Sequence, residues 1–264
     1  MDLGTTKMIA RTEGGIGWMI FNQPEKHNAV SYEMWLAVPK IMAAFEADPQ
    51  VRVIVLAGAG ERAFVSGADI SEFEKKRGTT DAIKVYDDAG NAAHAALNAA
   101  QKPMISMIRG ICIGGGLAIT LSTDLRICSS DSVFAVPAAR LGLGYRYSGI
   151  KKLVDIVGPA FAKEIFFSAG KFTAEDARIM GLVNRVVPPA ELEAYVKNYA
   201  DTIAGNAPLT VKAAKFIANE TVRDESKRNL ARCTELVEQC FKSNDYTEGR
   251  RAFMEKRKPA FTGT

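Results

Sequence analysis

Apolar and polar positions predict two kinds of element at the start of the chain. Met8–Thr12 and Ile16–Phe21 are strand-like, and the Gly14-Gly15 pair between them predicts a hairpin. From Ser31 to about Ala47 the apolar positions recur every three or four residues, which predicts a helix capped by Ser31. Pro39 lies inside this segment and is expected to kink or split the helix, because proline has no amide proton to donate.

Short apolar runs and longer helical segments then alternate along the chain. The runs expected to form strands are Val51–Leu56, Pro103–Ile113, Leu125–Cys128 and Val183–Val187, and the expected helices are Asp81–Gln101 and Leu117–Ser122. Nearly continuous apolar runs are typical of strands that are covered on both faces. The alternation predicts an α/β fold with mainly parallel strands.

After Ser148 the pattern becomes mostly helical. Pro159 suits the first turn of a helix, and Thr173-Ala-Glu-Asp176 resembles a capping box. Between Glu191 and Lys258 we expect three helices, broken near Ala207-Pro208 and near Asp245. We therefore divide the chain into an α/β core, residues 1–190, and a helical region, residues 191–264, which packs on the core and on neighbouring subunits.

Composition narrows the possible partners. The chain has 264 residues, of which 47% are hydrophobic and 24% charged, as in ordinary globular proteins. A net charge of +4 argues against a nucleic-acid surface but suits a small anionic ligand. We find no apolar run long enough for a membrane span and no signal peptide. The four cysteines form no C-x-x-C pair, so we expect neither disulfides nor a metal site, and a cytoplasmic location.

Two glycine-containing loops stand out as candidate chemistry. The loop Phe64–Ile70 follows a buried strand, and Gly114-Gly115-Gly116 lies between a strand and a helix. Amides at the start of a helix have no partner within it and favour negative charge. The plainer interpretation of the glycines is close packing of strand against helix. Since both loops follow parallel strands, one N–H from each could converge on a single oxygen, as in an oxyanion hole.

Six segments together resemble one family. They are Asn22–Ala29, Phe64–Ile70, Gly110–Gly116, Asp124, Gly181–Asn184 and Glu248–Phe261, and they span nearly the whole chain in the family's order. The sequence resembles the crotonase, or enoyl-CoA hydratase/isomerase, superfamily. The resemblance implies a spiral of ββα units with a helical C-terminal trimerisation region, assembled as a homotrimer or a dimer of trimers. It also implies an acyl-CoA substrate, no bound cofactor, and an oxyanion hole made by the N–H groups of Ala68 and Gly115.

The resemblance also implies where coenzyme A binds. The segments near the adenine in relatives match Glu25, Lys26 and His27, together with Ala68, Asp69 and Ile70. A lysine matching Lys256, from another subunit, often holds the phosphates. Lys256 could instead lie in a solvated helix end, and Asp69 could be a simple turn residue.

The chain departs from the family's hydratases at two positions. Those enzymes use two glutamates, and the matching positions here are Ala118 and the segment Pro137-Ala138-Ala139. Water addition needs groups that deprotonate water and protonate the α-carbon, and alanine can do neither. The two-glutamate mechanism is therefore disfavoured.

The segment Leu141–Ile150 is similar to methylmalonyl-CoA decarboxylase, a family enzyme that also lacks both glutamates. By this resemblance Tyr145 would orient a substrate carboxylate, and Arg146 could attract it. Tyr145 and Tyr147 could instead be packed wall residues, and Arg146 a surface residue. The decarboxylase has histidine at the position of Ala68, and Arg146 is not expected there.

Three functional hypotheses follow. The first is an enzyme that forms a thioester enolate, with decarboxylation of a 2-carboxyacyl-CoA as its candidate reaction. The second is an enoyl-CoA hydratase or isomerase whose acids lie elsewhere, for example Glu72 or Asp88. The third is an acyl-CoA binding protein without catalysis. No nucleic-acid or membrane partner is expected in any of them.

Overall fold

Two β-sheets and a set of helices make up the computed structural model, which describes residues 1–69 and 80–264, with side chains from residue 84 in the second stretch. The larger sheet contains β1 (Met8–Glu13), β2 (Ile16–Phe21), β3 (Val53–Gly58), β5 (Met104–Ile108), β7 (Leu125–Ser129) and β10 (Arg185–Val187). The smaller sheet contains β4 (Ala63–Val65), β6 (Ile111–Ile113), β8 (Val133–Ala135) and β9 (Phe172–Thr173). The α-helices are α1 (Tyr32–Ala47), α3 (Thr80–Asn98), α4 (Gly115–Thr120), α5 (Tyr147–Ser168), α6 (Ala174–Ile179), α7 (Leu192–Ala204), α8 (Pro208–Thr221), α9 (Leu230–Lys242) and α10 (Asn244–Met254). Short 3₁₀ helices are η1 (Pro24–Lys26), η3 (Pro137–Leu141), η4 (Pro189–Glu191) and η5 (Glu225–Lys227).

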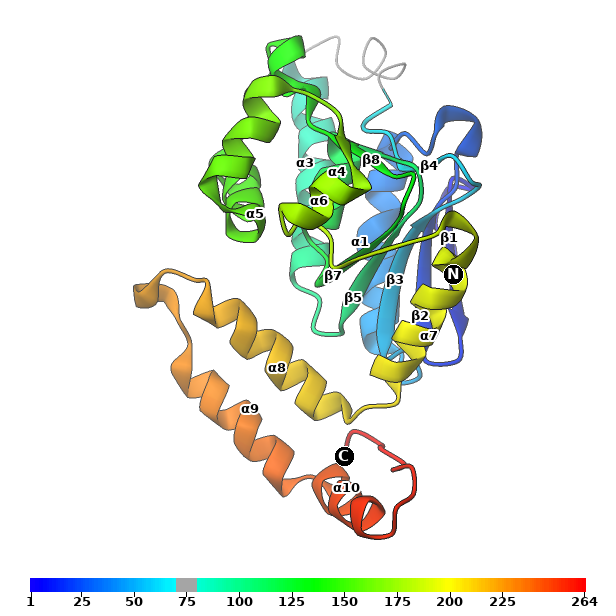
Figure 1. The fold of residues 1–264 in the computed structure, drawn as a ribbon, viewed down its shortest axis with the longest axis vertical. Helices are drawn as coiled ribbons and strands as arrows, with labels where there is room; N and C mark the ends of the chain where they lie inside the picture. The colour runs from blue at the N-terminus through cyan, green and yellow to red at the C-terminus, as the bar shows by residue number, and fades with distance from the viewer. Residues whose placement is uncertain (70–79) are drawn as a thin grey trace.

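Successive strands alternate between the two sheets. Strand β3 joins the larger sheet and β4 the smaller one before α3, and the same order recurs as β5, β6, α4 and as β7, β8, α5. Neighbouring strands are parallel from β2 to β10 in the larger sheet and from β4 to β8 in the smaller one. The α/β class and the mainly parallel pairing are confirmed, and each ββα unit contributes one strand to each sheet (Figure 1).

Helices cover both faces of the larger sheet. Along β2 the side chains of Ile16 and Trp18 pack against α7, whereas Met19 and Phe21 join the core that includes α1 and α3. This alternation is the two-residue period of a strand, and both faces are apolar because both are covered. Figure 1 shows α7 on one side of the strands and α1 with α3 on the other.

One expected strand is in fact two. Residues Pro103–Ile113 were expected to be continuous, but β5 ends at Ile108 and β6 starts at Ile111, in the other sheet. The chain turns at Gly110, where φ is +60° and a Cβ would lie 2.2 Å from the carbonyl oxygen of Arg62. Only glycine fits such a turn without displacing backbone. The apolar run Pro103–Ile113 does not reveal this turn. Strand β4, which contains Phe64 and Val65 of the first glycine loop, was not expected either.

Of the expectations based on proline, a split of α1 at Pro39 is wrong, and a helix start at Pro159 is confirmed. Helix α1 runs unbroken from Tyr32 to Ala47, so Pro39 does not split it. The buried side chains of α1, among them Val38 and Phe45, hold the segment in the core despite the missing hydrogen bond. In α5 the backbone is non-helical at Gly158, and Pro159 opens the second half. The capping box of Thr173 and Asp176 at the start of α6 is also confirmed.

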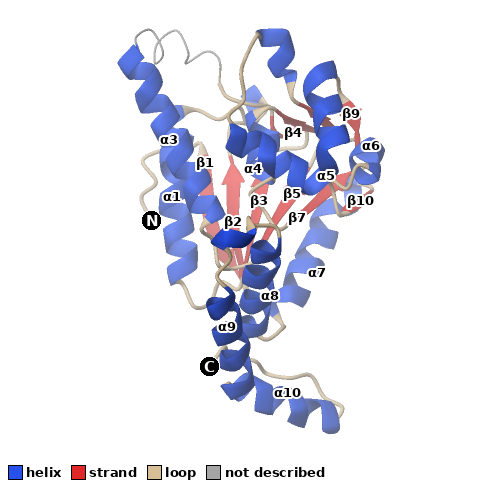
Figure 2. Cartoon of the chain, turned by 90° about the vertical axis from the view of Figure 1, so that its left-hand side faces the viewer, coloured by secondary structure: helices blue, strands red, loops and turns tan. Residues whose placement is uncertain are grey.

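The C-terminal region has four α-helices, where three were expected. Residues 191–258, all of which the structure describes, contain α7, α8, α9 and α10. The unexpected break separates α8 from α9 at residues 222–229, a polar segment without glycine or proline. Helices α8, α9 and α10 extend away from the sheets in both views (Figures 1 and 2). Among the described residues, no helix combines the length and the apolar character that a membrane crossing requires.

Candidate active site

The two glycine loops meet at one edge of the smaller sheet. Ala68 follows β4, Gly115 is the first residue of α4 after β6, and β4 and β6 are parallel neighbours. A Cβ at Gly115 would lie 3.7 Å from the amide nitrogen of Ala68, so the two backbones approach closely. The expectation that each loop follows a parallel strand is confirmed for Gly114–Gly116, which follow β6, whereas Phe64 and Val65 of the first loop themselves belong to β4.

The backbone hydrogen bonds around Ala68 and Gly115 show which neighbouring groups are already paired. Val30 forms an isolated parallel bridge with Ala68, in which its N–H donates to Gly67 (2.8 Å) and its carbonyl accepts from Asp69 (3.0 Å). This pattern uses the residues on either side of Ala68 and leaves its own N–H directed away from Val30. Gly115 begins α4, where an N–H has no acceptor within the helix. Among the described residues, neither N–H has a backbone acceptor.

The glycines beside Gly115 have structural reasons of their own. Gly114 has φ +54°, and its N–H donates to Ala135 at 2.9 Å. A Cβ at Gly116 would lie 2.1 Å from the carbonyl oxygen of Val65, so only glycine lets α4 pack this closely on β4. The packing interpretation is confirmed for Gly116, and the Gly115 backbone lies close to Ala68, as an oxyanion hole would require.

A cavity of about 150 Å³ is lined by Gly114, the residue before Gly115, and we call it the Gly114 cavity. Its apolar wall comes from Gly114, Leu117, Ala118, Leu121, Val136, Gly149, Leu153 and Phe166. Its polar side chains are Asn91, His94 and Asn98 of α3, and Tyr145, Ser148 and Lys152 at or in α5. No carboxylate of the described side chains lines it. Gly114 and Val136 come directly after β6 and β8, the strand ends where α/β sheets usually bind ligands.

Two basic side chains set the electrostatics of the Gly114 cavity. Burial lowers the pKa of His94 to about 4, and the charge of Lys152 adds to the effect. The His94 ring lies against Trp35, with ring centroids 5.6 Å apart. Burial also lowers the pKa of Lys152 to about 8. Near neutral pH the cavity therefore contains a neutral imidazole and an ammonium group that is mostly charged.

Of the two lip residues expected to act on a substrate, the structure brings Tyr145 to the cavity. Its ring packs edge-on against Phe166 at 4.9 Å, and burial raises the pKa of the phenol. Arg146 does not line the cavity: its guanidinium lies 3.7 Å from Asp87 of α3, and its side chain is 76% exposed. Tyr147 is 78% exposed, so it is not a packed wall residue.

The structure does not place a candidate replacement for the missing glutamates among the described residues that line the Gly114 cavity. Asp88 is exposed on α3 and does not line it. Glu72 and the expected adenine-contact residue Ile70 lie outside the described residues. Ala118 does line the cavity, with a methyl group where hydratases of the family are expected to have an acid. Ala138 is buried in η3 and does not line it.

The segments expected near coenzyme A lie side by side. Lys26 Nζ is 2.8 Å from Asp69 Oδ2, and the N–H of Ser66 donates to the carbonyl of His27 at 3.1 Å. Asp69 is buried, so it is more than a turn residue, whereas Glu25 is exposed. His27 has φ +53°, and its Nδ1 is a buried polar atom without a hydrogen-bond partner in the described structure.

Lys256 lies far along the same chain from this site. It is exposed just after α10, with φ +53°. Figures 1 and 2 both show α10 at the opposite end of the molecule from α4. Within one chain, Lys256 therefore does not join the other expected coenzyme A residues. Among the described residues, no cluster of three or more His, Cys, Asp and Glu side chains is placed to hold a metal ion.

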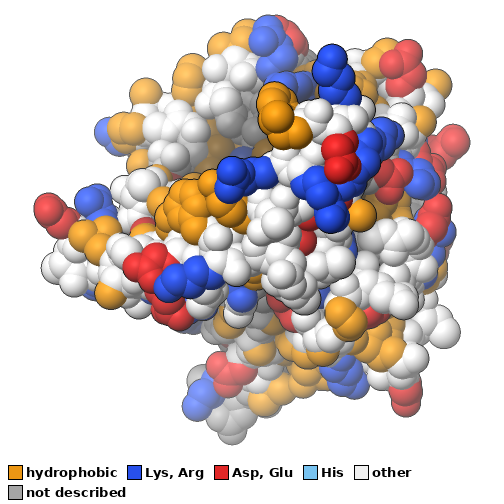
Figure 3. Space-filling view, turned by 90° about the horizontal axis from the view of Figure 1, so that it is seen from below, with side chains coloured by type: hydrophobic (Ala, Val, Ile, Leu, Met, Phe, Trp, Pro, Cys, Tyr) orange, Lys and Arg blue, Asp and Glu red, His pale blue; other side chains and the backbone are white. Residues whose placement is uncertain are grey.

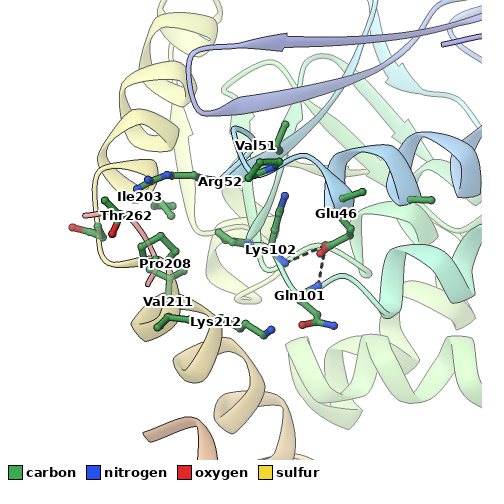
Figure 4. A pocket seen from close by; sticks show the side chains of 17 residues that line it. Glu46, Val51, Arg52, Gln101, Lys102, Ile203, Pro208, Val211, Lys212 and Thr262 are labelled. Atoms are coloured by element: carbon green, nitrogen blue, oxygen red, sulfur yellow. Dashed lines mark hydrogen bonds between the residues drawn. The ribbon is translucent and has the colours of Figure 1, made fainter. Parts of the chain in front are cut away.

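A second, larger depression of about 540 Å³ lies at the amino ends of β3 and β5, and we call it the C-terminal hollow (Figure 4). It is lined by residues from the end of α1, by the segments before β3 and β5, and by α8 and the chain end. Most of its charged groups are held by backbone atoms. Glu46 accepts from the amides of Gln101 and Lys102, and Lys102 Nζ donates to the carbonyls of Phe45 and Asp48.

The sequence reasoning missed the polar lining of the Gly114 cavity. Asn91, His94 and Asn98 are three and four residues apart, which places them on one face of α3. This spacing is visible in the sequence, but a polar helix face is usually the solvent face. Lys152 has no local signal, because it reaches the cavity only through the packing of α5 against α3 and α4.

Known proteins resemble the chain over its length. The family model described as "Enoyl-CoA hydratase/isomerase" matches residues 11–264. A short-chain-enoyl-CoA hydratase of Clostridium acetobutylicum is 35% identical over 95% of both chains. A peroxisomal Delta(3,5)-Delta(2,4)-dienoyl-CoA isomerase of Arabidopsis thaliana is 30% identical over 95% of this chain and 94% of its own.

Structural similarity extends equally far. A crystal structure of an enoyl-CoA hydratase/carnithine racemase from Magnetospirillum magneticum superposes with a TM-score of 0.89 at 32% identity, covering 98% of this chain and 97% of the other. The spiral of ββα units is thus the crotonase fold. With this fold and the family match over residues 11–264, the chain belongs to the enoyl-CoA hydratase/isomerase family, the crotonase superfamily.

Proposed function

We propose that this enzyme binds an acyl-coenzyme A and stabilises the enolate of its thioester with the N–H groups of Ala68 and Gly115. The close approach of these two backbones, with both amides lacking backbone acceptors in the described structure, carries the proposal. A thioester oxygen placed between them would accept two hydrogen bonds. Those bonds strengthen as negative charge develops on the oxygen, so they favour the enolate over the bound substrate.

The first candidate reaction is decarboxylation of a 2-carboxyacyl-CoA. The bond between C2 and the carboxylate breaks, carbon dioxide leaves, and the electron pair moves through C2 to the thioester oxygen. A proton then adds to C2. This reaction needs no carboxylate base, which agrees with the absence of carboxylates among the described side chains of the Gly114 cavity. Tyr145 lines that cavity and would orient the departing carboxylate.

The second candidate is hydration or isomerisation of an enoyl-CoA. Relatives named as a short-chain-enoyl-CoA hydratase and a dienoyl-CoA isomerase support it, since each matches nearly the whole chain. Both reactions pass charge to the thioester oxygen and would use the same two amides. They also need a proton acceptor and donor, for which Ala118 is unsuited.

The shared step and the net reaction can be tested separately. Incubating a panel of saturated acyl-CoA thioesters with the protein in D₂O should produce α-deuterated thioester, detected by mass spectrometry. Carbon dioxide release from methylmalonyl-CoA, slowed in Tyr145→Phe, would support decarboxylation, and hydration of crotonyl-CoA would support the second candidate. Tight binding of thioesters with no exchange and no turnover would contradict catalysis and favour a binding protein.

We also propose that residues 191–264 pack on the α/β core and on neighbouring subunits, in a homotrimer or a dimer of trimers in the cytoplasm. Large apolar side chains are exposed on this region, among them Leu230, Phe241, Phe253 and Met254. Figure 3, seen from the end that carries α10, shows orange side chains exposed among charged ones. In such an assembly Lys256 of a neighbouring subunit would reach the coenzyme A phosphates. Sedimentation equilibrium tests the assembly, and a monomer at working concentration would contradict it.

A further inference from the structure

The ammonium group of Lys152 has neutral hydrogen-bond partners and no paired carboxylate in the described part of the chain. It projects from α5 into the Gly114 cavity and donates to the Asn98 side-chain oxygen and to Ser122 Oγ, the latter at 3.1 Å. Both acceptors are neutral. No carboxylate in the described part of the chain forms an ion pair with it, whereas the adjacent Lys151 is held by Asp155 at 2.8 Å. A partly buried charge without a counter-ion is costly, so an anion in this cavity would be stabilised.

The position of Ser122 sets the distance of this ammonium from the thioester. Ser122 comes seven residues after Gly115, and its N–H donates to Ile119, which continues the last turn of α4. At a rise of about 1.5 Å per residue, seven residues span about 10 Å. Lys152 Nζ is within hydrogen-bond distance of Ser122, so the ammonium lies beside the C-terminal end of α4, the end opposite Gly115.

A spacing of this size disfavours a carboxylate on C2 as the partner of Lys152. Such a carboxylate is two bonds of about 1.5 Å from the thioester carbon, far short of the ammonium. An extended acyl chain of about five or six carbons, with a hydrogen bond of about 2.9 Å at each end, covers the distance.

We propose that the enzyme takes acyl-CoA substrates whose acyl chain ends in a carboxylate, which Lys152 binds in the Gly114 cavity. Asn98 and Asn91, on the same face of α3, supply neutral polar groups beside it. His94 faces the same cavity and carries no charge near neutral pH, because its pKa is lowered to about 4. Among the described residues that line the cavity, the Lys152 ammonium is therefore the group that carries a charge near neutral pH. This inference rests on the proposed acyl-CoA function and holds for either candidate reaction at the thioester.

Calorimetric titration with adipyl-CoA and hexanoyl-CoA tests the proposal, because these thioesters have equal carbon counts and differ in the terminal carboxylate. Wild-type protein should bind adipyl-CoA more tightly. Lys152→Met should weaken adipyl-CoA binding by about tenfold or more, the usual worth of a charged hydrogen bond. The loss of affinity for hexanoyl-CoA should be much smaller, because that thioester has no terminal carboxylate. Lys151→Met, with the same loss of charge one residue away, should bind like wild type.

The alternatives give different results. Equal adipyl-CoA affinity in wild type and Lys152→Met would overturn the proposal, as would an equal loss in Lys151→Met. Loss of malonyl-CoA binding in Lys152→Met would place the ammonium near the thioester and also overturn it. If no thioester binds or exchanges with wild type, the proposed function itself fails. Lys152→Gln, checked by circular dichroism, replaces Lys152→Met if that variant does not fold.

Discussion

The Gly114 cavity and the C-terminal hollow lie at opposite ends of the parallel strands. They differ in how many of their polar groups already have hydrogen-bond or ion-pair partners. The hollow is the larger, about 540 Å³ against about 150 Å³. Yet its Glu46 and Lys102 are held by backbone atoms, and Arg52 donates to the carbonyl of Phe261 at 2.8 Å. The smaller cavity has a lysine with neutral partners. Its Gly114 precedes Gly115, whose amide, like that of Ala68, has no backbone acceptor in the described structure.

The comparison shows that the volume of a cavity does not by itself identify the ligand site in this protein. A buried polar group that already has its hydrogen bonds gains little from a ligand, whereas an unsatisfied one gains much. We interpret the hollow as the junction where the C-terminal helices meet the core, and we propose that the chemistry takes place at the cavity. Variants in each place can break or sharpen this distinction.

The largest expected effect is on rate and follows from removing one amide proton. Gly115 is the first residue of α4, where proline is tolerated, and Gly114 before it has no Cβ to meet the ring. Gly115→Pro should slow α-proton exchange by about 10²- to 10³-fold, as loss of one oxyanion-hole donor does. Gly115→Ala keeps the N–H and adds a Cβ in ordinary contact with Ala68, so it should exchange much faster than the proline variant. Similar rates in the two variants would show that space, not the N–H, matters.

The next effect is on stability and concerns the contact of α8 with the core beside the hollow. Lys215 of α8, with an 11% exposed side chain, donates to Asp124 at 2.9 Å and to the Lys102 carbonyl at 2.8 Å. Lys215→Met should lower the free energy of unfolding by about 2–3 kcal/mol, because Asp124 loses a charged partner. Urea denaturation at fixed protein concentration measures it. The rate per folded site should stay unchanged, and a lowered rate would mean that the hollow contributes to the chemistry.

His94 gives the cavity its own dependence of stability on pH. The folded pKa of about 4 lies below the ordinary value of 6.5, so between these values the unfolded chain binds a proton that the folded chain does not. The free energy of unfolding therefore falls as pH falls from 6.5 toward 4. From pH 7 to pH 5 the loss should be about 2 kcal/mol, at about 1.4 kcal/mol per pH unit. His94→Gln should remove this part of the loss, and an unchanged pH profile would contradict the burial of His94.

Much of the fold follows from local patterns. The hairpin, α1 and the doubly covered strands were predictable because their apolar periods report burial directly. The separation of β5 from β6 was not, because it depends on the contact of Gly110 with Arg62, which only the folded chain brings together. The break between α8 and α9 lies in a polar segment that lacks the usual helix-ending residues.

The residues of the candidate site also fall into those that the sequence could predict and those that it could not. The glycine loops were predictable because backbone approach demands a residue type, and the structure places Ala68 beside Gly115. Tyr145 was found by resemblance and lines the cavity, but Arg146, beside it in sequence, faces Asp87. Lys152 and His94 were missed since their role depends on the packing of α5 against α3. A lysine in a helix gives no sign of whether its head meets solvent, a carboxylate or a cavity.

The smallest expected effect is the sharpest test of the comparison. Lys212 lines the C-terminal hollow from α8, one turn before Lys215, and is the labelled lysine of α8 in Figure 4. If the hollow is a junction rather than a ligand site, Lys212→Met should change thioester affinity and exchange rate by less than about twofold, as surface substitutions do. It should also leave stability nearly unchanged, which makes it the matched control for Lys215→Met. A tenfold loss of acyl-CoA affinity in Lys212→Met would instead show that the larger depression takes part in binding, and that unsatisfied amides alone do not mark the site.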